Sequence, residues 1–152
     1  MHFEMDNTFA PISLEAIQEV EKRYGFILPN DYKDFLLKYN GGKPRPNVMF
    51  TTKNGFLTSY LISVLPLFDR KVPSLVGNFL FFNKEEGNLP SNIITFGEDP
   101  LRNLLCISVE GNNTGFIYYW DYMNDDSDTP TYDHLVLISE SFSKFIEELR
   151  TE

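Results

Sequence analysis

Cysteine, long apolar runs and an N-terminal basic segment are scarce or missing in this sequence, and each shortage excludes a class of protein. Cys106 is the only cysteine among 152 residues, so no disulfide can form within the chain, which suits a reducing compartment. No apolar stretch approaches the roughly 20 residues that a membrane-spanning helix needs. The N-terminus is acidic where a secretory signal would be basic and then apolar. We therefore expect a cytoplasmic protein with no membrane segment.

Residues suited to catalysis are also few. Histidine is the commonest general base near neutral pH, and the chain has only two, His2 near the terminus and His134, which we predict to be structural. Cys106 lies in an apolar stretch, where a buried, unreactive thiol is expected. The sequence contains no phosphate-binding loop, no dinucleotide-binding glycine motif and no nucleophile elbow. We predict a protein that is not an enzyme and needs no cofactor.

Basic residues are outnumbered, and the acidic excess is concentrated in one part of the chain. The sequence has 13 Lys and Arg against 22 Asp and Glu, a net charge of −9. Residues 97–133 hold eight acids and one base, Arg102, so this segment carries −7 and the rest of the chain only −2. Such a field opposes binding to nucleic acid or to an anionic membrane and favours a basic partner. The same charge would also keep the protein soluble, so both interpretations stay open.

The segment DYMNDDSDTPTYD, residues 121–133, contains five aspartates and no basic residue. It could form a metal site, a surface that docks a basic partner, or a solvated loop. A calcium-binding EF-hand loop needs acids at its first, third and fifth positions, glycine at the sixth and glutamate at the twelfth. A loop beginning at Asp126 has Thr131 at the glycine position, and one beginning at Asn124 has Thr129 there. Neither ends on glutamate, so we predict no dedicated metal site.

Helices are predicted near both ends of the chain. Ser13 and Gly25 are expected to begin and end a first helix. Pro29 opens a second helix that stops at residues 40–42, and Ser141 is expected to cap a third near the C-terminus. Because the first two helices are short and joined by few residues, we expect them to share a buried seam.

Strands are predicted between these helices. They cover residues 47–52, 59–65, 92–97, 104–109, 115–122 and 134–139. Residues 74–84 have the apolar spacing of a helix, which we predict there, although residues 79–82 fit a strand equally well. The strand at 134–139 is apolar on both faces and is expected in the sheet interior. One face of the strand at 115–122 is expected to meet the core, and alternation alone does not show which. Helices, antiparallel strands and a closing helix together predict an α+β fold.

Four stretches of the chain share a pattern with one known family. The first stretch covers residues 12–42. Its most specific part is LPNDYKDFLLKYNGG (28–42), where proline begins a helix and Asn-Gly-Gly stops it. The others are ITFGED (94–99), GFIYYWDY (115–122) and SFSKFIEEL (141–149). In this order the stretches closely resemble the Smi/Knr-like proteins of the SUKH superfamily, and the resemblance spans nearly the whole chain.

The resemblance implies one domain over residues 1–152, with a twisted, mostly antiparallel sheet, an N-terminal helix pair and a C-terminal helix packed on it. It also implies non-enzymatic work. Bacterial members resemble immunity proteins, which bind and silence the toxic domain of a polymorphic toxin, often a nuclease. Fungal relatives behave as interaction hubs in cell-wall signalling. The expected function is therefore a toxin-binding immunity protein, and the alternative is a scaffold or regulator that binds a signalling or cell-wall partner.

The charge pattern and the resemblance together lead to a hypothesis about the binding surface. A nuclease active site attracts phosphate and is therefore basic, so an acidic inhibitor would be drawn to it. We expect the docking residues to be Glu98, Asp99, Trp120, Asp121, Asp125, Asp126 and Asp128. The opposing interpretation is that these residues only solubilise an edge of the fold. A hydrolase that uses the Glu98-Asp99 pair is a third possibility, which adjacent carboxylates do not favour.

Overall fold

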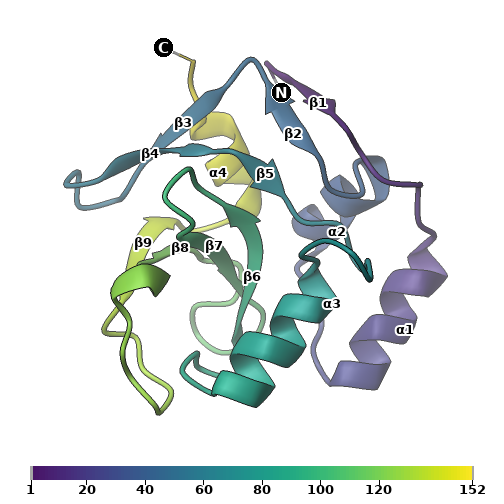
Figure 1. The fold of residues 1–152 in the computed structure, drawn as a ribbon. Coiled ribbons are helices and arrows are strands. Elements are labelled where there is room, and N and C mark those ends of the chain that lie inside the picture. The colour runs from purple at the N-terminus through teal and green to yellow at the C-terminus, as the bar shows by residue number, and fades with distance from the viewer. Residues whose placement is uncertain (1, 152) are drawn as a thin grey trace.

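A five-stranded antiparallel sheet lies at the centre of the fold, with strand order β5-β6-β7-β8-β9 (Figure 1). This is a computed structural model, and it describes residues 2–151. The five strands are β5 (Ser63–Val64), β6 (Ile93–Glu98), β7 (Leu104–Ser108), β8 (Ile117–Trp120) and β9 (Leu135–Ser139). Two antiparallel pairs accompany the sheet: β1 (Glu4–Asp6) with β2 (Lys43–Arg45), and β3 (Val48–Thr51) with β4 (Thr58–Leu61).

Helices pack around this sheet. They are α1 (Leu14–Tyr24), α2 (Asn30–Lys38), α3 (Leu75–Asn78), the π-helical segment η1 (Phe79–Glu86), the 3-10 turn η2 (Tyr122–Asn124) and α4 (Phe142–Glu148). α3 and η1 form one continuous rod beside β6, while α1 and α2 lie on the side of the molecule away from β9 (Figure 1). The structure confirms the predicted α+β class. It also confirms the N-terminal helix pair, the helix within residues 74–84 and the C-terminal helix.

The capping signals act as the sequence predicts. The Ser13 hydroxyl accepts a hydrogen bond of 3.1 Å from the Ala16 N–H, and the Ser141 hydroxyl accepts one of 3.0 Å from the Lys144 N–H. Gly25 ends α1 in the left-handed conformation, with φ of 78°. These bonds satisfy N–H groups that the first helical turn leaves unpaired, so local chemistry fixes where α1 and α4 begin.

A buried carboxylate joins α1 to α2, in the seam that the two short helices were expected to share. Glu21 lies 3.1 Å from the Lys33 ammonium and accepts a hydrogen bond of 2.7 Å from the Leu28 N–H. Ile17, Tyr32 and Leu36 complete the seam in the larger core. The linker between the helices is thus held by a charge as well as by apolar packing.

Side chains from the sheet enter two apolar clusters, one on each face. The larger cluster contains Phe96, Leu105, Ile107, Ile117 and Tyr119, packed with residues of α1, α2 and α4. The smaller cluster contains Phe82, Leu89, Ile93, Leu104, Cys106, Tyr118 and Trp120. Alternation along β8 therefore buries both of its faces, where the sequence led us to expect a single core face.

Two strand predictions are wrong in an informative way. Residues 59–65 were expected as one strand, but the chain changes sheets at Ile62, so β4 pairs with β3 and β5 pairs with β6. β9 was expected in the sheet interior and instead forms an edge, because among residues 2–151 only β8 pairs with it in the sheet. Its outer side is partly covered by the β3–β4 hairpin, where the Lys53 N–H donates to the Leu137 carbonyl at 2.7 Å.

Gly41, in the Asn-Gly-Gly segment that follows α2, packs closely against Pro66, and a substitution can test this contact. A Cβ at Gly41 would lie 2.7 Å from the backbone nitrogen of Pro66, and its φ is 75°. Gly25 has a similar φ of 78° with open space around it. We expect Gly41→Ala to lower the free energy of unfolding by about 3 kcal/mol and Gly25→Ala by only about 1 kcal/mol, measured by urea denaturation. Equal losses would show that the contact with Pro66 contributes nothing.

Candidate partner-binding surface

Two acidic segments, the turn at residues 98–103 and the loop at residues 121–133, start from the same end of the five-stranded sheet. The antiparallel register places Glu98, Leu104, Trp120 and Leu135 side by side on neighbouring strands. The turn after β6 and the loop after β8 therefore leave the sheet at the same end. A hydrogen bond of 3.0 Å from the Met123 N–H to the Asn103 side-chain oxygen joins the turn to the loop.

Asp99 is buried inside the turn at residues 98–103, with 4% of its surface exposed. Its carboxylate accepts four hydrogen bonds of 2.8–3.0 Å, from the Ser59 and Tyr119 hydroxyls and from the N–H groups of Leu101 and Asn103. Burial and the bond to this carboxylate raise the pKa of the Tyr119 hydroxyl. Asp99 holds the turn in shape, and its side chain is not at the surface that a partner would touch.

Trp120 is fully buried and holds the acidic loop, residues 121–133, through a hydrogen bond to Asp125. Its indole N–H donates to the Asp125 carboxylate at 2.9 Å. The Asp125 side chain is 1% exposed, and it also accepts hydrogen bonds from the N–H and hydroxyl of Ser127. The His134 ring lies 3.6 Å away. Burial raises the pKa of Asp125, but the bonds from Ser127 and Trp120 outweigh burial and lower it below the ordinary value.

The far end of the loop is held by residues that the sequence did not single out. The Tyr132 hydroxyl accepts hydrogen bonds from the side-chain amides of Asn92 at 3.0 Å and Asn113 at 3.1 Å. Its ring packs edge-on against Tyr118, with centroids 5.9 Å apart. The only sequence signal for this contact was the asparagine-rich turn before β8. With both ends anchored, the loop presents its carboxylates in a fixed arrangement.

The Asp125 anchor predicts a pH-dependent loss of stability. Because the folded state lowers the pKa of this carboxyl, its stabilisation is complete above the ordinary pKa of 3.8 and disappears as the pH falls through the lowered value. We expect Asp125→Asn to cost about 2 kcal/mol of unfolding free energy at neutral pH. The gap from the native protein should close in acid. Asp126→Asn, at an exposed neighbour, is the control for urea denaturation at both pH values, and a gap that persists in acid would contradict this account.

Two exposed apolar side chains lie on the same turn and loop as the acids that keep contact with solvent. Leu101 is 69% exposed and Met123 is 60% exposed, one on each of the two joined segments. Of the acids in the turn and the loop that keep contact with solvent, Glu98 and Asp121 are partly buried, and Asp126 and Asp128 are exposed. We call these six residues the acidic sheet end. Protein-binding patches usually combine exposed apolar side chains with charged ones, as these two segments do.

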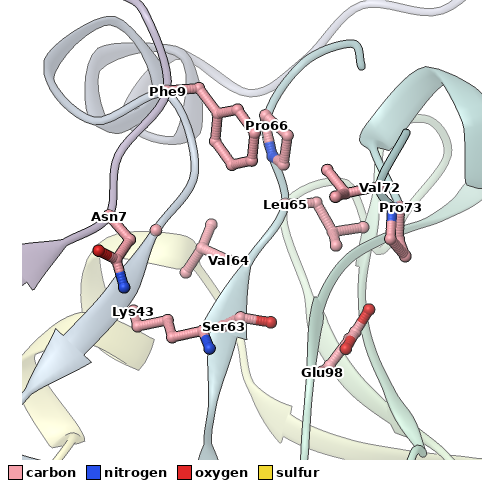
Figure 2. Close-up of a pocket in the computed structure, with 11 residues that line it drawn as sticks. Asn7, Phe9, Lys43, Ser63, Val64, Leu65, Pro66, Val72, Pro73 and Glu98 are labelled. Atoms are coloured by element: carbon pink, nitrogen blue, oxygen red, sulfur yellow. The ribbon is translucent and has the colours of Figure 1, made fainter. Parts of the chain in front are cut away.

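Two hollows flank Glu98, the last residue of β6. The larger, of about 340 Å³, is lined by β5, by Asn7, Phe9 and Lys43, and by Val72 and Pro73, and Figure 2 shows Glu98 at its border. The smaller, of about 220 Å³, is lined by Arg102 and Tyr122 and shares Pro73 and Glu98 with the first. Burial raises the pKa of the Glu98 carboxyl, and the charges of Arg102 and Lys43 offset part of this rise.

Within residues 2–151, no three or more side chains of His, Cys, Asp or Glu converge as the ligands of a metal ion would. In the acidic loop, Asp125 instead accepts hydrogen bonds from Trp120 and Ser127, while Asp126 and Asp128 are exposed to solvent. No helix in the same part of the chain is both long and apolar enough to cross a membrane. Burial also raises the pKa of the Cys106 thiol well above its ordinary value.

Comparison with known proteins identifies the family of this chain. The model of the SMI1 / KNR4 family (SUKH-1) matches residues 11–148, which include both acidic segments and all four α-helices. The chain belongs to this family. The SUKH-1 match confirms the resemblance seen in the sequence, and the family is of the immunity-protein type, which works through protein partners.

A curated relative also aligns with this SUKH-1 chain. The SPbeta prophage-derived uncharacterized protein YokK of Bacillus subtilis (strain 168) is 29% identical over 154 residues. The alignment covers 91% of this chain and 74% of the relative. The similarity thus extends over most of this chain.

Proposed function

We propose that this chain is an immunity protein, which binds a cognate protein toxin through the acidic sheet end and thereby neutralises it. Membership of the SUKH-1 family supports a function through protein partners. The toxic domain is proposed to be basic, with a nuclease as the best candidate, because a site that attracts phosphate also attracts carboxylates.

One observation carries this proposal. Two segments that are separated in sequence, and that hold most of the negative charge, start from the same end of the sheet, are joined there by a hydrogen bond, and carry the exposed side chains of Leu101 and Met123. Concentrated charge of this kind raises the rate of association with a basic partner by roughly 10- to 1,000-fold at low salt. The exposed apolar pair supplies the desolvated contact that charges alone do not provide.

The proposed mechanism requires no chemical step in this chain. Among residues 2–151, the carboxylates at the sheet end that are fully enclosed, Asp99 and Asp125, are already saturated by hydrogen bonds. They hold the turn and the loop in place, which reduces the entropy lost when a partner binds. Neutralisation then follows from occupying the basic surface of the toxin.

Co-expression tests the function directly. The product of the gene next to the one that encodes this chain should arrest growth when expressed alone, and growth should recover when this chain is present. A pull-down from the same cells should recover the two proteins together. Arrest that persists despite normal levels of this chain would contradict an immunity function. Capture of a non-toxic signalling or cell-wall protein would favour the regulatory alternative.

A further inference from the structure

We propose that Glu98 receives an arginine side chain of the protein partner, in the groove formed by the two hollows that share this residue. This inference rests on the proposed function, because it names one contact within the acidic sheet end. It goes beyond that function in assigning a specific partner side chain to a specific pocket.

Glu98 differs from every other buried or partly buried acidic residue in the part of the chain that the structure describes. Its carboxylate is partly buried, yet within residues 2–151 no hydrogen bond or ion pair reaches it. The other buried or partly buried acids all have partners: Asp6, Glu21, Asp31, Asp69, Asp99, Asp121 and Asp125. A charge withdrawn from water without compensation is costly, and sites that keep one are usually sites that bind something.

The nearest bases do not neutralise Glu98 internally. Lys43 borders the larger hollow and Arg102 the smaller, and both influence Glu98 electrostatically, but both are exposed to solvent and neither forms an ion pair with it. Water screens such charges efficiently. The carboxylate therefore stays available to a cation that enters the groove and excludes water from it.

The walls of the groove suit an arginine side chain in particular. The larger hollow is bordered by Val64, Leu65, Val72 and Pro73, which can cover the methylene groups of a long side chain (Figure 2). The smaller hollow adds the aromatic rings of Phe82 and Tyr122. A guanidinium group pairs with a carboxylate through two parallel hydrogen bonds and stacks on aromatic rings, which the ammonium of lysine does less well.

Short peptides test the pocket without the toxin. The probe is acetyl-Leu-Arg-Leu-amide, and the matched controls replace arginine by uncharged citrulline or by lysine. We expect saturable NMR shifts at the amides of Val64, Glu98 and Leu101, with the arginine peptide binding about tenfold more tightly than the citrulline peptide. Glu98→Gln should remove this preference and Glu147→Gln, at an exposed acid on α4, should keep it. Equal binding of all three peptides, no saturation, or shifts centred on Asp126 and Asp128 would overturn the assignment.

Stability gives an independent readout. Because burial raises the pKa of Glu98 in the folded state, its ionised form opposes folding above the ordinary carboxyl pKa of 4.5. Glu98→Gln should therefore raise the thermal midpoint at neutral pH and leave it unchanged in acid. A lower midpoint at neutral pH would show that Glu98 is a structural residue and would overturn the inference.

The two proposals fail in different ways. If the toxin binds Glu98→Gln as tightly as the native protein, the pocket assignment is wrong and the immunity function stands. If the arginine peptide binds as expected but the adjacent gene product neither arrests growth nor binds, the groove is a peptide site and the immunity function is wrong.

Discussion

Converting Asp121, Asp126 and Asp128 together to asparagine is expected to weaken toxin binding by roughly 30-fold, since three exposed charge pairs at about 0.7 kcal/mol each contribute about 2 kcal/mol. These carboxylates are accessible, and none of them anchors the loop to the sheet. Most of the loss should appear in the association rate, because exposed rim charges act mainly before contact. Surface plasmon resonance at low and high salt measures both the rate and its salt dependence, which should become shallower in the variant.

A matched control separates the position of these charges from their number. Glu15, Glu19 and Glu147 are exposed acids on α1 and α4, outside the acidic sheet end. Converting these three to glutamine changes the net charge by the same amount as the loop variant. We expect affinity and salt dependence close to those of the native protein. If both triple variants lose affinity equally, only the overall charge matters and the acidic sheet end is not the docking surface.

Asp99→Ala is expected to lower the free energy of unfolding by about 4 kcal/mol, because it leaves buried donors without an acceptor. Two of these donors are the N–H groups that close the turn, and the Tyr119 hydroxyl reaches Asp99 from β8. Losing all of these bonds at once should also release Leu101 from its fixed position. Urea denaturation measures the cost.

Asp99→Asn is the matched control for this prediction. Its amide oxygen can still accept the N–H groups of Leu101 and Asn103, and the Tyr119 hydroxyl can rotate to accept from the amide N–H. We therefore expect about half the loss seen with alanine. An alanine variant as stable as the native protein would show that the four hydrogen bonds to Asp99 contribute little to the fold.

Local signals made the helices predictable, and non-local pairing made the strand edges unpredictable. Ser13, Gly25 and Ser141 act within three or four residues of themselves, so their effects can be inferred from the sequence. The edge position of β9 depends on which strands lie beside β8, and an apolar pattern on both faces does not encode this. The short strand β1 is polar and three residues long, so it left no recognisable pattern.

The candidate surface was predictable in location but not in its residues. Charge counting identified the two acidic segments, and the antiparallel order of the strands placed them together. It could not separate Asp99 and Asp125, which bond inward, from Asp126 and Asp128, which face solvent. The distinction depends on donors such as the hydroxyl of Ser59, which is 40 residues away from Asp99 in sequence.

Titrating the purified toxin domain with this protein, while toxin activity is followed, tests the central claim most directly. A protein that acts only by binding should reduce the activity in a straight line that reaches its minimum at equimolar protein. Separating the complex should then return an unmodified, active toxin. Complete inactivation by a small fraction of an equivalent, or a toxin that stays inactive and covalently altered after separation, would mean that this chain performs a reaction and would contradict the account.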